Sequence, residues 1–211
     1  SQWISFLDSD DAWLPTKLEK QIKACHKNND MRLIHTDEIW YRKGKRVNQM
    51  KKHRKRGGNI FEYCLLLCCI SPSSVLMRKD LVEDIGLFDE DLPACEDYDM
   101  WLRVTSKEPI LYLEEALTIK YGGHEDQLSS QFWGMDCFRV YSIEKILCNK
   151  LLTSSQEVAA RKVMIGKINI LIQGGIKRGN MEIVDIYSKK LDDWANEDSK
   201  FNSRIPQHLS W

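Results

Sequence analysis

The first 130 residues predict an α/β fold, because short apolar runs alternate there with amphipathic helical segments. The run at residues 3–7 is the first example, and such runs are typical of strands buried within a sheet. From residue 131 onward helical periodicity takes over. We therefore expect an α/β domain over residues 1–130 and an α-helical extension over residues 131–211.

Apolar spacing and turn residues predict the order of the elements. Leu14, Leu18, Ile22 and Cys25 recur at helical spacing, which predicts a helix over residues 15–26. Strands are predicted at 3–7, 31–41, 74–78, 111–113 and 117–119, with 46–50 as a hairpin partner of 31–41. Further helices are predicted at 60–67, 79–86, 96–105, 138–148, 158–174 and 181–194, followed by a loose polar tail from residue 197.

An acidic turn follows the first predicted strand, where Asp8, Asp10 and Asp11 stand within four residues. Ligands of open α/β sheets bind beyond the carboxyl ends of the strands. Three carboxylates this close repel one another, and a divalent cation removes that penalty. The alternative is a helix N-cap, because Pro15 and acidic residues suit a first helical turn. The turn alone does not decide between metal binding and capping.

A second acidic pair, Glu96 and Asp97, opens the helix predicted at 96–105. The positive end of a helix dipole stabilises negative charge, so we expect both carboxylates to be ionised near neutral pH. A fixed, ionised carboxylate can act as a general base. Capping is again the alternative, and Asp99 with Arg103 forms an ordinary i,i+4 pair.

A histidine follows two glycines at Gly122-Gly123-His124. The glycines give the backbone freedom, so His124 could bind a metal or contact a phosphate. A single histidine in a loop more often does neither.

Charge and cysteine usage narrow the function classes. Lys and Arg balance Asp and Glu at 31 each, but no acidic residue occurs from Arg42 to Arg56. This basic segment is either a solvated loop or a surface for an anionic membrane or an anionic substrate. Nucleic acid is disfavoured as a partner because no base-stacking aromatic residues are interleaved in the segment. Seven cysteines without a CxxC pair indicate reduced thiols in a cytosolic protein rather than a structural zinc site.

Three motifs in this order resemble a family 2 glycosyltransferase of the GT-A fold. They are FLDSDDAWLP at residues 6–15, GLFDE at 86–90 and EDYDMWLR at 96–103. The resemblance covers about residues 1–130. It implies inverting transfer of a sugar from a nucleoside diphosphate sugar to the hydroxyl of a saccharide or lipid-linked acceptor. It also implies a place in cell-surface polysaccharide or glycan synthesis. The basic segment at 42–56 and the reduced thiols lead us to expect a cytoplasmic protein, peripheral at the inner face of the membrane.

The resemblance implies a role for each candidate residue. Asp8-Ser9-Asp10 corresponds to the DxD motif, with Asp10 as the main ligand of Mn2+ or Mg2+. Asp8 would hold the nucleotide ribose or the metal shell, and Asp11 is an additional donor-site acid. Asp97 would be the catalytic base, with Glu96 beside the acceptor. His124 would complete the metal site.

Two features depart from the family pattern. The loop at residues 71–74 lacks the glycine that many relatives carry there, which leaves the donor sugar open. Relatives also begin with a mononucleotide-binding half, which is absent before residue 1 of this sequence. We therefore expect the strand at 3–7 to have an unpaired edge, and the chain alone to bind donor weakly and to self-associate. Two other functions are retained as alternatives: a binding or scaffold protein built on an incomplete transferase, and, with less support, a basic nucleic-acid-binding protein.

Overall fold

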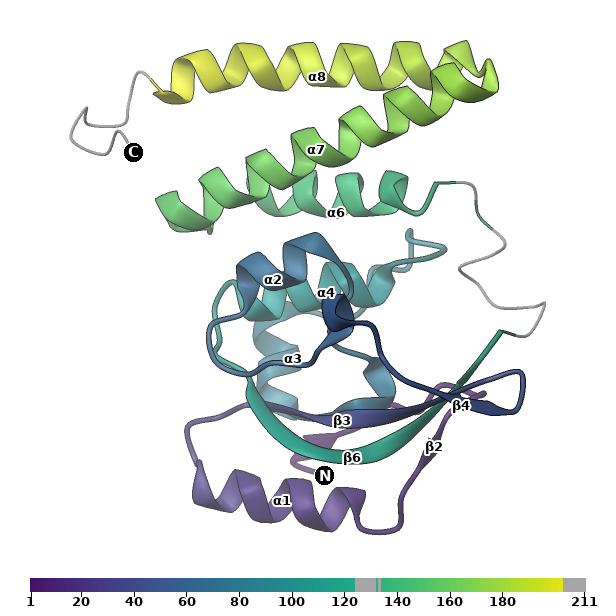
Figure 1. Ribbon diagram of the computed structural model, residues 1–211. Helices are drawn as coiled ribbons and strands as arrows, with labels where there is room; N and C mark the ends of the chain where they lie inside the picture. The colour runs from purple at the N-terminus through teal and green to yellow at the C-terminus, as the bar shows by residue number, and fades with distance from the viewer. Residues whose placement is uncertain (124–131, 133, 203–211) are drawn as a thin grey trace.

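A computed structural model describes residues 1–123, 132 and 134–202, with side chains up to residue 196. The molecule is layered (Figure 1). Helix α1 (Lys17–Lys27) covers one face of a mixed sheet, and all the other helices stack in succession on the opposite face. The α/β prediction for the first part of the chain is therefore confirmed.

The sheet has six strands in the described residues, in the order β1-β5-β3-β6-β2, with β4 paired to β3. Strands β3 and β6 run parallel at its centre, and every other pairing is antiparallel. Strand β1 pairs only with β5 and so forms one edge. The strands are β1 (Trp3–Ile4), β2 (Ala12–Trp13), β3 (Leu33–Arg42), β4 (Lys45–Val47), β5 (Val75–Arg78) and β6 (Leu111–Gly122).

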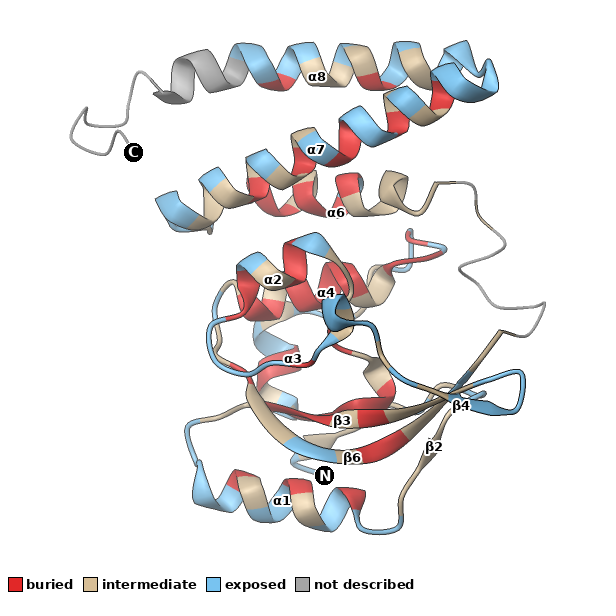
Figure 2. Ribbon diagram, viewed as in Figure 1, coloured by how far each residue is buried: buried red, intermediate tan, exposed pale blue. Residues whose placement is uncertain are grey.

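Alternate residues of the central strands face two separate apolar clusters. Leu33 and Met77 join the large core under the upper helices, whereas Ile34 and Leu76 join a small cluster with Cys25 of α1. This alternation is the period of two that a β-strand imposes on its side chains. The sheet is thus covered on both faces, as Figure 2 shows by the buried residues of β3 and β6.

The upper helices share one core with the sheet. They are α2 (Phe61–Leu66), α3 (Lys79–Ile85), α4 (Glu96–Thr105), α6 (Asp136–Cys148), α7 (Ser154–Arg178) and α8 (Met181–Asn202). Tyr98 and Trp101 of α4 are buried in the same cluster as Ile143 of α6 and Leu171 of α7. None of the described helices is long and apolar enough to cross a bilayer.

Several predicted boundaries were wrong for identifiable reasons. The first strand ends at Ile4, since the side chain of Ser5 rather than its backbone bonds the carbonyl of Val75. The segments at 111–113 and 117–119 form one strand with a register shift opposite residues 36–38. The tail expected to be loose from residue 197 continues α8 to Asn202.

Helix α7 does not end at Gly174-Gly175 but continues to Arg178. A Cβ atom on Gly175 would lie 2.9 Å from Val184 Cγ2 and 3.1 Å from the carbonyl oxygen of Asn180. Gly175 therefore permits close approach of α8 rather than a break in α7. Gly179, with φ 69°, ends the helix in the left-handed conformation that favours glycine.

Candidate active site

The turn between β1 and β2 gathers the three predicted carboxylates. Each of Asp8, Asp10 and Asp11 offers a carboxylate oxygen, and these oxygens lie within 4.8 Å of one another. The amide of Asp11 donates to the carbonyl of Asp8 across 3.0 Å, which closes the turn. An oxygen cluster of this size is compatible with a hard divalent cation.

A lysine that the sequence did not single out neutralises part of this charge. Lys120 of β6 places its Nζ 3.0 Å from Asp11 Oδ2 and 3.4 Å from Asp8 Oδ2. The side chain of Asp11 is fully buried, while that of Asp8 is 41% exposed. The turn therefore has an inner carboxylate paired with lysine and outer carboxylates that face solvent.

The pKa values follow this division. Burial raises the pKa of Asp11, although the charge of Lys120 opposes that rise. At Lys120 burial alone would lower the pKa. The negative charges of Asp11, Glu38 and Asp8 outweigh burial and raise the pKa above its ordinary value. Lys120 is thus held as a cation by the acids around it.

Ser73 fixes the turn from the neighbouring 3-10 helix at Pro72–Ser74. Its Oγ accepts a hydrogen bond from the backbone amide of Asp8 at 3.0 Å, and its carbonyl oxygen accepts one from the indole Nε1 of Trp13 at 2.7 Å. The hydroxyl of Thr118 donates to the same carbonyl at 3.3 Å. The loop at 71–74, which lacks the glycine that many relatives carry, therefore supports the acidic turn.

A second lysine, Lys17, lies behind the turn and is fully buried. Lys17 Nζ donates to Ser5 Oγ at 3.2 Å and to the carbonyl of Val75 at 3.3 Å, and it stands 4.3 Å from the centroid of the Trp13 ring. Burial lowers the pKa of Lys17 to about 7. Its contacts place it in the support of the turn rather than in the carboxylate cluster.

The second acidic pair lies at the start of α4, as predicted. Cys95, directly before the helix, has φ 63°, so the chain turns sharply into Glu96. Asp97 Oδ1 accepts a hydrogen bond from the backbone amide of Tyr98 at 2.6 Å. Asp97 Oδ2 accepts one from the thiol of Cys68 at 2.8 Å. The base candidate is thus held by one backbone donor and one thiol donor.

The electrostatics of this pair differ from the expectation. Burial raises the pKa of Asp97 and of Glu96, whereas the helix dipole was expected to favour ionisation. The charge of Asp8 contributes to both shifts, and Lys120 opposes the shift of Asp97. The two acidic motifs are far apart in sequence, but the charge of Asp8 in the first acts on Glu96 and Asp97 in the second.

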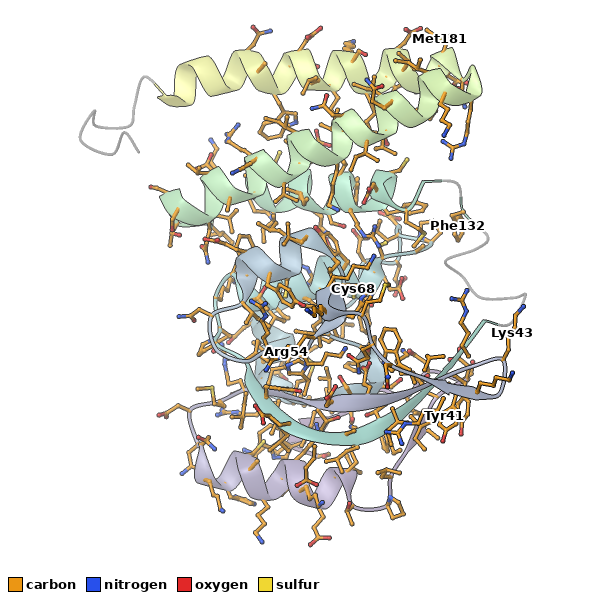
Figure 3. The ribbon with its side chains drawn as sticks, viewed as in Figure 1. Tyr41, Lys43, Arg54, Cys68, Phe132 and Met181 are labelled. Atoms are coloured by element: carbon orange, nitrogen blue, oxygen red, sulfur yellow. The ribbon has the colours of Figure 1, made fainter. Side chains whose placement is uncertain are left out.

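The remaining predictions have mixed outcomes. His124 lies outside the described residues. In the basic segment at 42–56, Lys55 is buried and pairs with Glu38 Oε1 at 3.1 Å, contrary to a wholly solvated loop. The exposed basic residues of the segment are Arg42, Lys43, Lys45, Arg46, Lys51, Lys52, Arg54 and Arg56. Figure 3 shows Lys43 at the tip of the β3–β4 hairpin and Tyr41 in β3 nearby.

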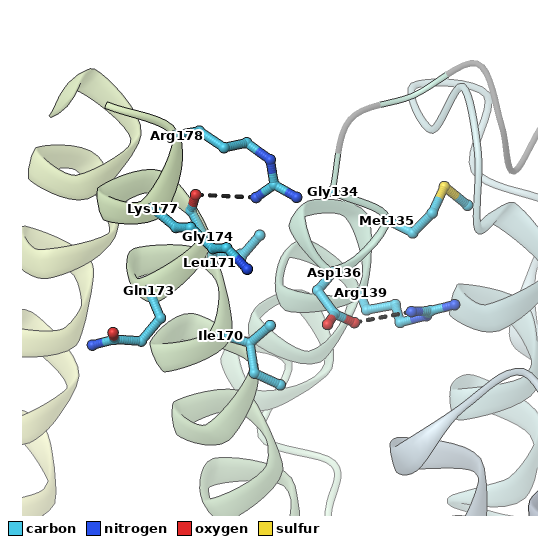
Figure 4. A pocket seen from close by; sticks show the side chains of 10 residues that line it. All are labelled: Gly134, Met135, Asp136, Arg139, Ile170, Leu171, Gln173, Gly174, Lys177 and Arg178. Atoms are coloured by element: carbon cyan, nitrogen blue, oxygen red, sulfur yellow. Dashed lines mark hydrogen bonds and ion pairs between the residues drawn. The ribbon is translucent and has the colours of Figure 1, made fainter. Parts of the chain in front are cut away.

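A recess in the described part of the molecule lies away from these acids. It has a volume of about 450 Å3 between α6 and α7 (Figure 4). Arg139, Lys177 and Arg178 are among its lining residues, and Asp136 pairs with Arg139 at 2.9 Å. Neither the acidic turn nor Glu96 and Asp97 contribute to its lining.

Comparison with known proteins finds similarity over most of the chain, including the residues of the candidate site. A family model described as "Glycosyltransferase like family 2" matches residues 1–150. An uncharacterised glycosyltransferase of Rickettsia conorii is 30% identical over 135 residues, which are 62% of this chain and 22% of that protein. Another from Methanocaldococcus jannaschii is 26% identical over 121 residues, which are 57% of this chain and 41% of that protein. The chain thus spans less than half of the length of these relatives.

Solved structures show the same fold. The crystal structure of Staphylococcus aureus TarS 1–349 in complex with UDP-GlcNAc aligns with a TM-score of 0.57 and 17% identity. The alignment covers 80% of this chain and 48% of that one. Another crystal structure of Staphylococcus aureus TarS aligns with a TM-score of 0.51 over 80% of this chain and 28% of that one. This likeness confirms the predicted GT-A architecture.

Proposed function

The chain belongs to glycosyltransferase-like family 2, and from this premise we propose that it performs metal-assisted, inverting transfer of a sugar. The donor is a nucleoside diphosphate sugar, and the acceptor is a hydroxyl of a saccharide or a lipid-linked saccharide. The product enters cell-surface polysaccharide or glycan synthesis. Residues 1–130 supply this chemistry, and the described part of residues 131–211 is a helical extension made of α6, α7 and α8.

The observation that carries the proposal is the juxtaposition of two groups of acids. Oxygens of Asp8, Asp10 and Asp11 lie within 4.8 Å of one another. The segment at 68–73 contacts both groups, because Ser73 Oγ accepts a hydrogen bond from the Asp8 amide at 3.0 Å and the Cys68 thiol donates to Asp97 Oδ2 at 2.8 Å. A metal-and-diphosphate site beside a base is the arrangement that a single displacement on a sugar nucleotide needs.

The carboxylates fit a Mn2+ or Mg2+ ion in part. Asp8 and Asp10 would hold it, since Mg2+ typically takes one or two protein carboxylates and completes its shell with phosphate oxygens and water. Asp11 fits less well, because its fully buried side chain already pairs with Lys120. We therefore assign Asp11 to holding Lys120. His124 remains a proposed additional ligand, and a bound cation would supply neutralisation of charge on the departing diphosphate.

The chain's own residues carry the proton transfer. Asp97 accepts the proton of the acceptor hydroxyl while that oxygen forms a bond to the anomeric carbon. The bond from that carbon to the diphosphate oxygen breaks, and its electron pair leaves with the diphosphate. Glu96 borders the acceptor, and the ammonium of Lys120 adds fixed positive charge beside Asp8.

Support for the donor class comes from a neighbour. TarS 1–349 has been solved in complex with UDP-GlcNAc, and it shares the fold over 80% of this chain. We propose a uridine-type nucleoside diphosphate sugar as the first donor to test, with the sugar left open.

Calorimetry tests the metal site. Mn2+ is titrated into the purified chain with UDP present, because the diphosphate supplies ligands that the protein lacks. We expect binding by the wild type and its loss in Asp10→Ala, with Asp91→Asn as an exposed acidic control from outside the site. Binding that survives Asp10→Ala would exclude the acidic turn. A wild type that binds neither Mn2+ nor UDP would favour an incomplete transferase that acts as a scaffold.

A second proposal concerns the basic segment, because eight of its nine basic side chains are exposed. We propose that it contacts an anionic membrane at the cytoplasmic face. Vesicle sedimentation with and without anionic phospholipid tests this, and Lys43→Glu with Arg46→Glu should weaken binding only to the anionic vesicles. Binding to DNA or RNA with a steep salt dependence would instead support the nucleic-acid alternative.

A further inference from the structure

The thiol of Cys68 makes a direct contact with the proposed base. Cys68 lies in the segment that leads from α2 to the 3-10 helix at 72–74, and its Sγ stands 2.8 Å from Asp97 Oδ2. The same sulfur lies 3.4 Å from the carbonyl oxygen of Ile70. One thiol proton cannot serve both acceptors fully, and the carboxylate oxygen is both closer and charged. Figure 3 shows Cys68 beside α2 and α4, above the sheet.

The surroundings keep this thiol protonated. Burial, followed by the charge of Asp97, raises the pKa of Cys68 well above its usual range. A protonated thiol is a donor, and Asp97 is left as the acceptor. The contact is therefore S–H to carboxylate, rather than a thiolate that would repel Asp97.

The segment that carries Cys68 is itself anchored at two points. Lys55 Nζ donates to the carbonyl of Cys69 at 3.0 Å and to Ser71 Oγ at 3.2 Å, while it pairs with Glu38. Two residues further on, Ser73 holds the amide of Asp8. One short segment thus contacts the proposed base through Cys68 and the acidic turn through Ser73.

We propose that Cys68 is a positioning residue, which holds Asp97 by a thiol hydrogen bond as an oriented proton acceptor. The proposal rests on the proposed function, in which Asp97 is the base. Tyr98 fixes one oxygen of Asp97 through its amide, and Cys68 fixes the other. Without Cys68, one carboxylate oxygen loses its protein donor and the carboxylate can rotate.

The thiol also biases the ionisation of Asp97, because a donor to a carboxylate favours its charged form. Loss of this donor should therefore raise the pKa of Asp97. Other titratable groups act on Asp97 and stay unchanged in the variants below. They are Lys120 of β6, Asp8 of the acidic turn, Cys95 and Glu96 at the start of α4, and Cys69 beside Cys68.

The first experiment compares pH profiles of kcat/KM for Cys68→Ala and Cys68→Ser. The acidic limb reports the base of the free enzyme. In Cys68→Ala it should move to higher pH by about 0.5 to 1 unit, since a donor to a charged group is lost. Cys68→Ser keeps a donor, so its limb should stay at or below the wild-type position. Cys148→Ala, at an exposed cysteine, is the control and should not move. Unmoved limbs in both Cys68 variants would overturn the proposal.

The second experiment needs no activity. Iodoacetamide alkylation, followed by mass spectrometry, gives the rate at Cys68 with Cys148 as an internal reference in the same chain. Asp97→Asn keeps the volume but removes the charge, so the thiol pKa should fall. Alkylation of Cys68 should then rise roughly threefold or more, because a fall of half a pKa unit triples the thiolate fraction. An unchanged rate would disprove the contact.

The two experiments fail in different ways. If Asp97 is not the base but the contact exists, alkylation responds while Asp97→Asn leaves turnover intact, and the proposed function fails alone. If Asp97 is the base but Cys68 does not position it, Asp97→Asn lowers turnover while the Cys68 variants keep the wild-type pH profile. That second outcome overturns the positioning role alone.

Discussion

The side chain of Asp11 is fully buried and Asp97 is half-buried, but the two carboxylates contact different groups. Asp11 pairs with the ammonium of Lys120 at 3.0 Å, whereas Asp97 accepts a neutral thiol and an amide. Burial raises the pKa of both carboxylates, but the group that opposes this rise most is the ammonium of Lys120 at Asp11 and the neutral thiol of Cys68 at Asp97. We propose that the same residue type has a structural role in the turn and a chemical role at α4.

The strongest test of this difference is turnover. Asp97→Asn keeps shape and the amide contact but cannot accept a proton, so kcat should fall by about 100-fold or more. Asp11→Asn should cost clearly less, because Asp11 touches Lys120 rather than the acceptor. The measurement is initial-rate transfer at saturating donor in an active preparation. Equal losses in the two variants would erase the distinction.

The structural role of Asp11 predicts a stability effect. Lys120→Met leaves the fully buried carboxylate of Asp11 without its cation, which should cost about 3 kcal/mol of unfolding free energy. The value lies at the low end for buried pairs because Lys120 is 27% exposed. Urea unfolding measures it, with Lys20→Met as the control. Lys20 pairs with Glu115 at the surface, so its loss should cost less than about 1 kcal/mol.

Removal of the support under the turn should have a smaller effect. Ser73→Ala deprives the amide of Asp8 of its acceptor, at a cost of about 1 kcal/mol, and loosens the carboxylate cluster. Mn2+ affinity in the presence of UDP should fall by less than about tenfold. Ser74→Ala removes a hydrogen bond within the same 3-10 turn, to Ser71, and should leave that affinity unchanged.

The smallest expected effect is on the pH dependence of the free energy of unfolding. The pKa of Asp97 is raised in the folded state, so its contribution to stability is full below the unfolded value of about 3.9. It is lost as pH rises through the folded value. Asp97→Asn does not titrate, so the variant should gain stability relative to wild type between pH 4 and pH 7. Thermal melts at both pH values measure this, and a constant difference would contradict it.

Local clustering explains which site residues were predictable. The site residues that could be predicted stand in short acidic groups beside apolar runs, so their placement in a turn or at a helix start follows from the sequence: Asp8, Asp10, Asp11, Glu96 and Asp97.

Their partners do not follow in this way. Lys120 is 112 residues from Asp8, and nothing in its own neighbourhood distinguishes it from other lysines. Cys68 resembles any thiol in an apolar stretch, since its contact with Asp97 exists only once α2 and α4 have packed. The role of Gly175 could not be predicted for the same reason, because Val184, against which it packs closely, lies in the next helix.

The hydrophobic core described above runs without interruption from Val75 of β5 through Tyr98 of α4 to Ile143 and Leu171 of the upper helices. The sequence changes character near residue 130, but we expect the parts on either side to unfold together as one cooperative unit. We expect a single calorimetric transition whose van't Hoff and measured enthalpies agree, since neither part can melt without exposing the other's apolar surface. Helices that contribute no residue to the acidic turn or to the start of α4 would then set the temperature at which the site is lost.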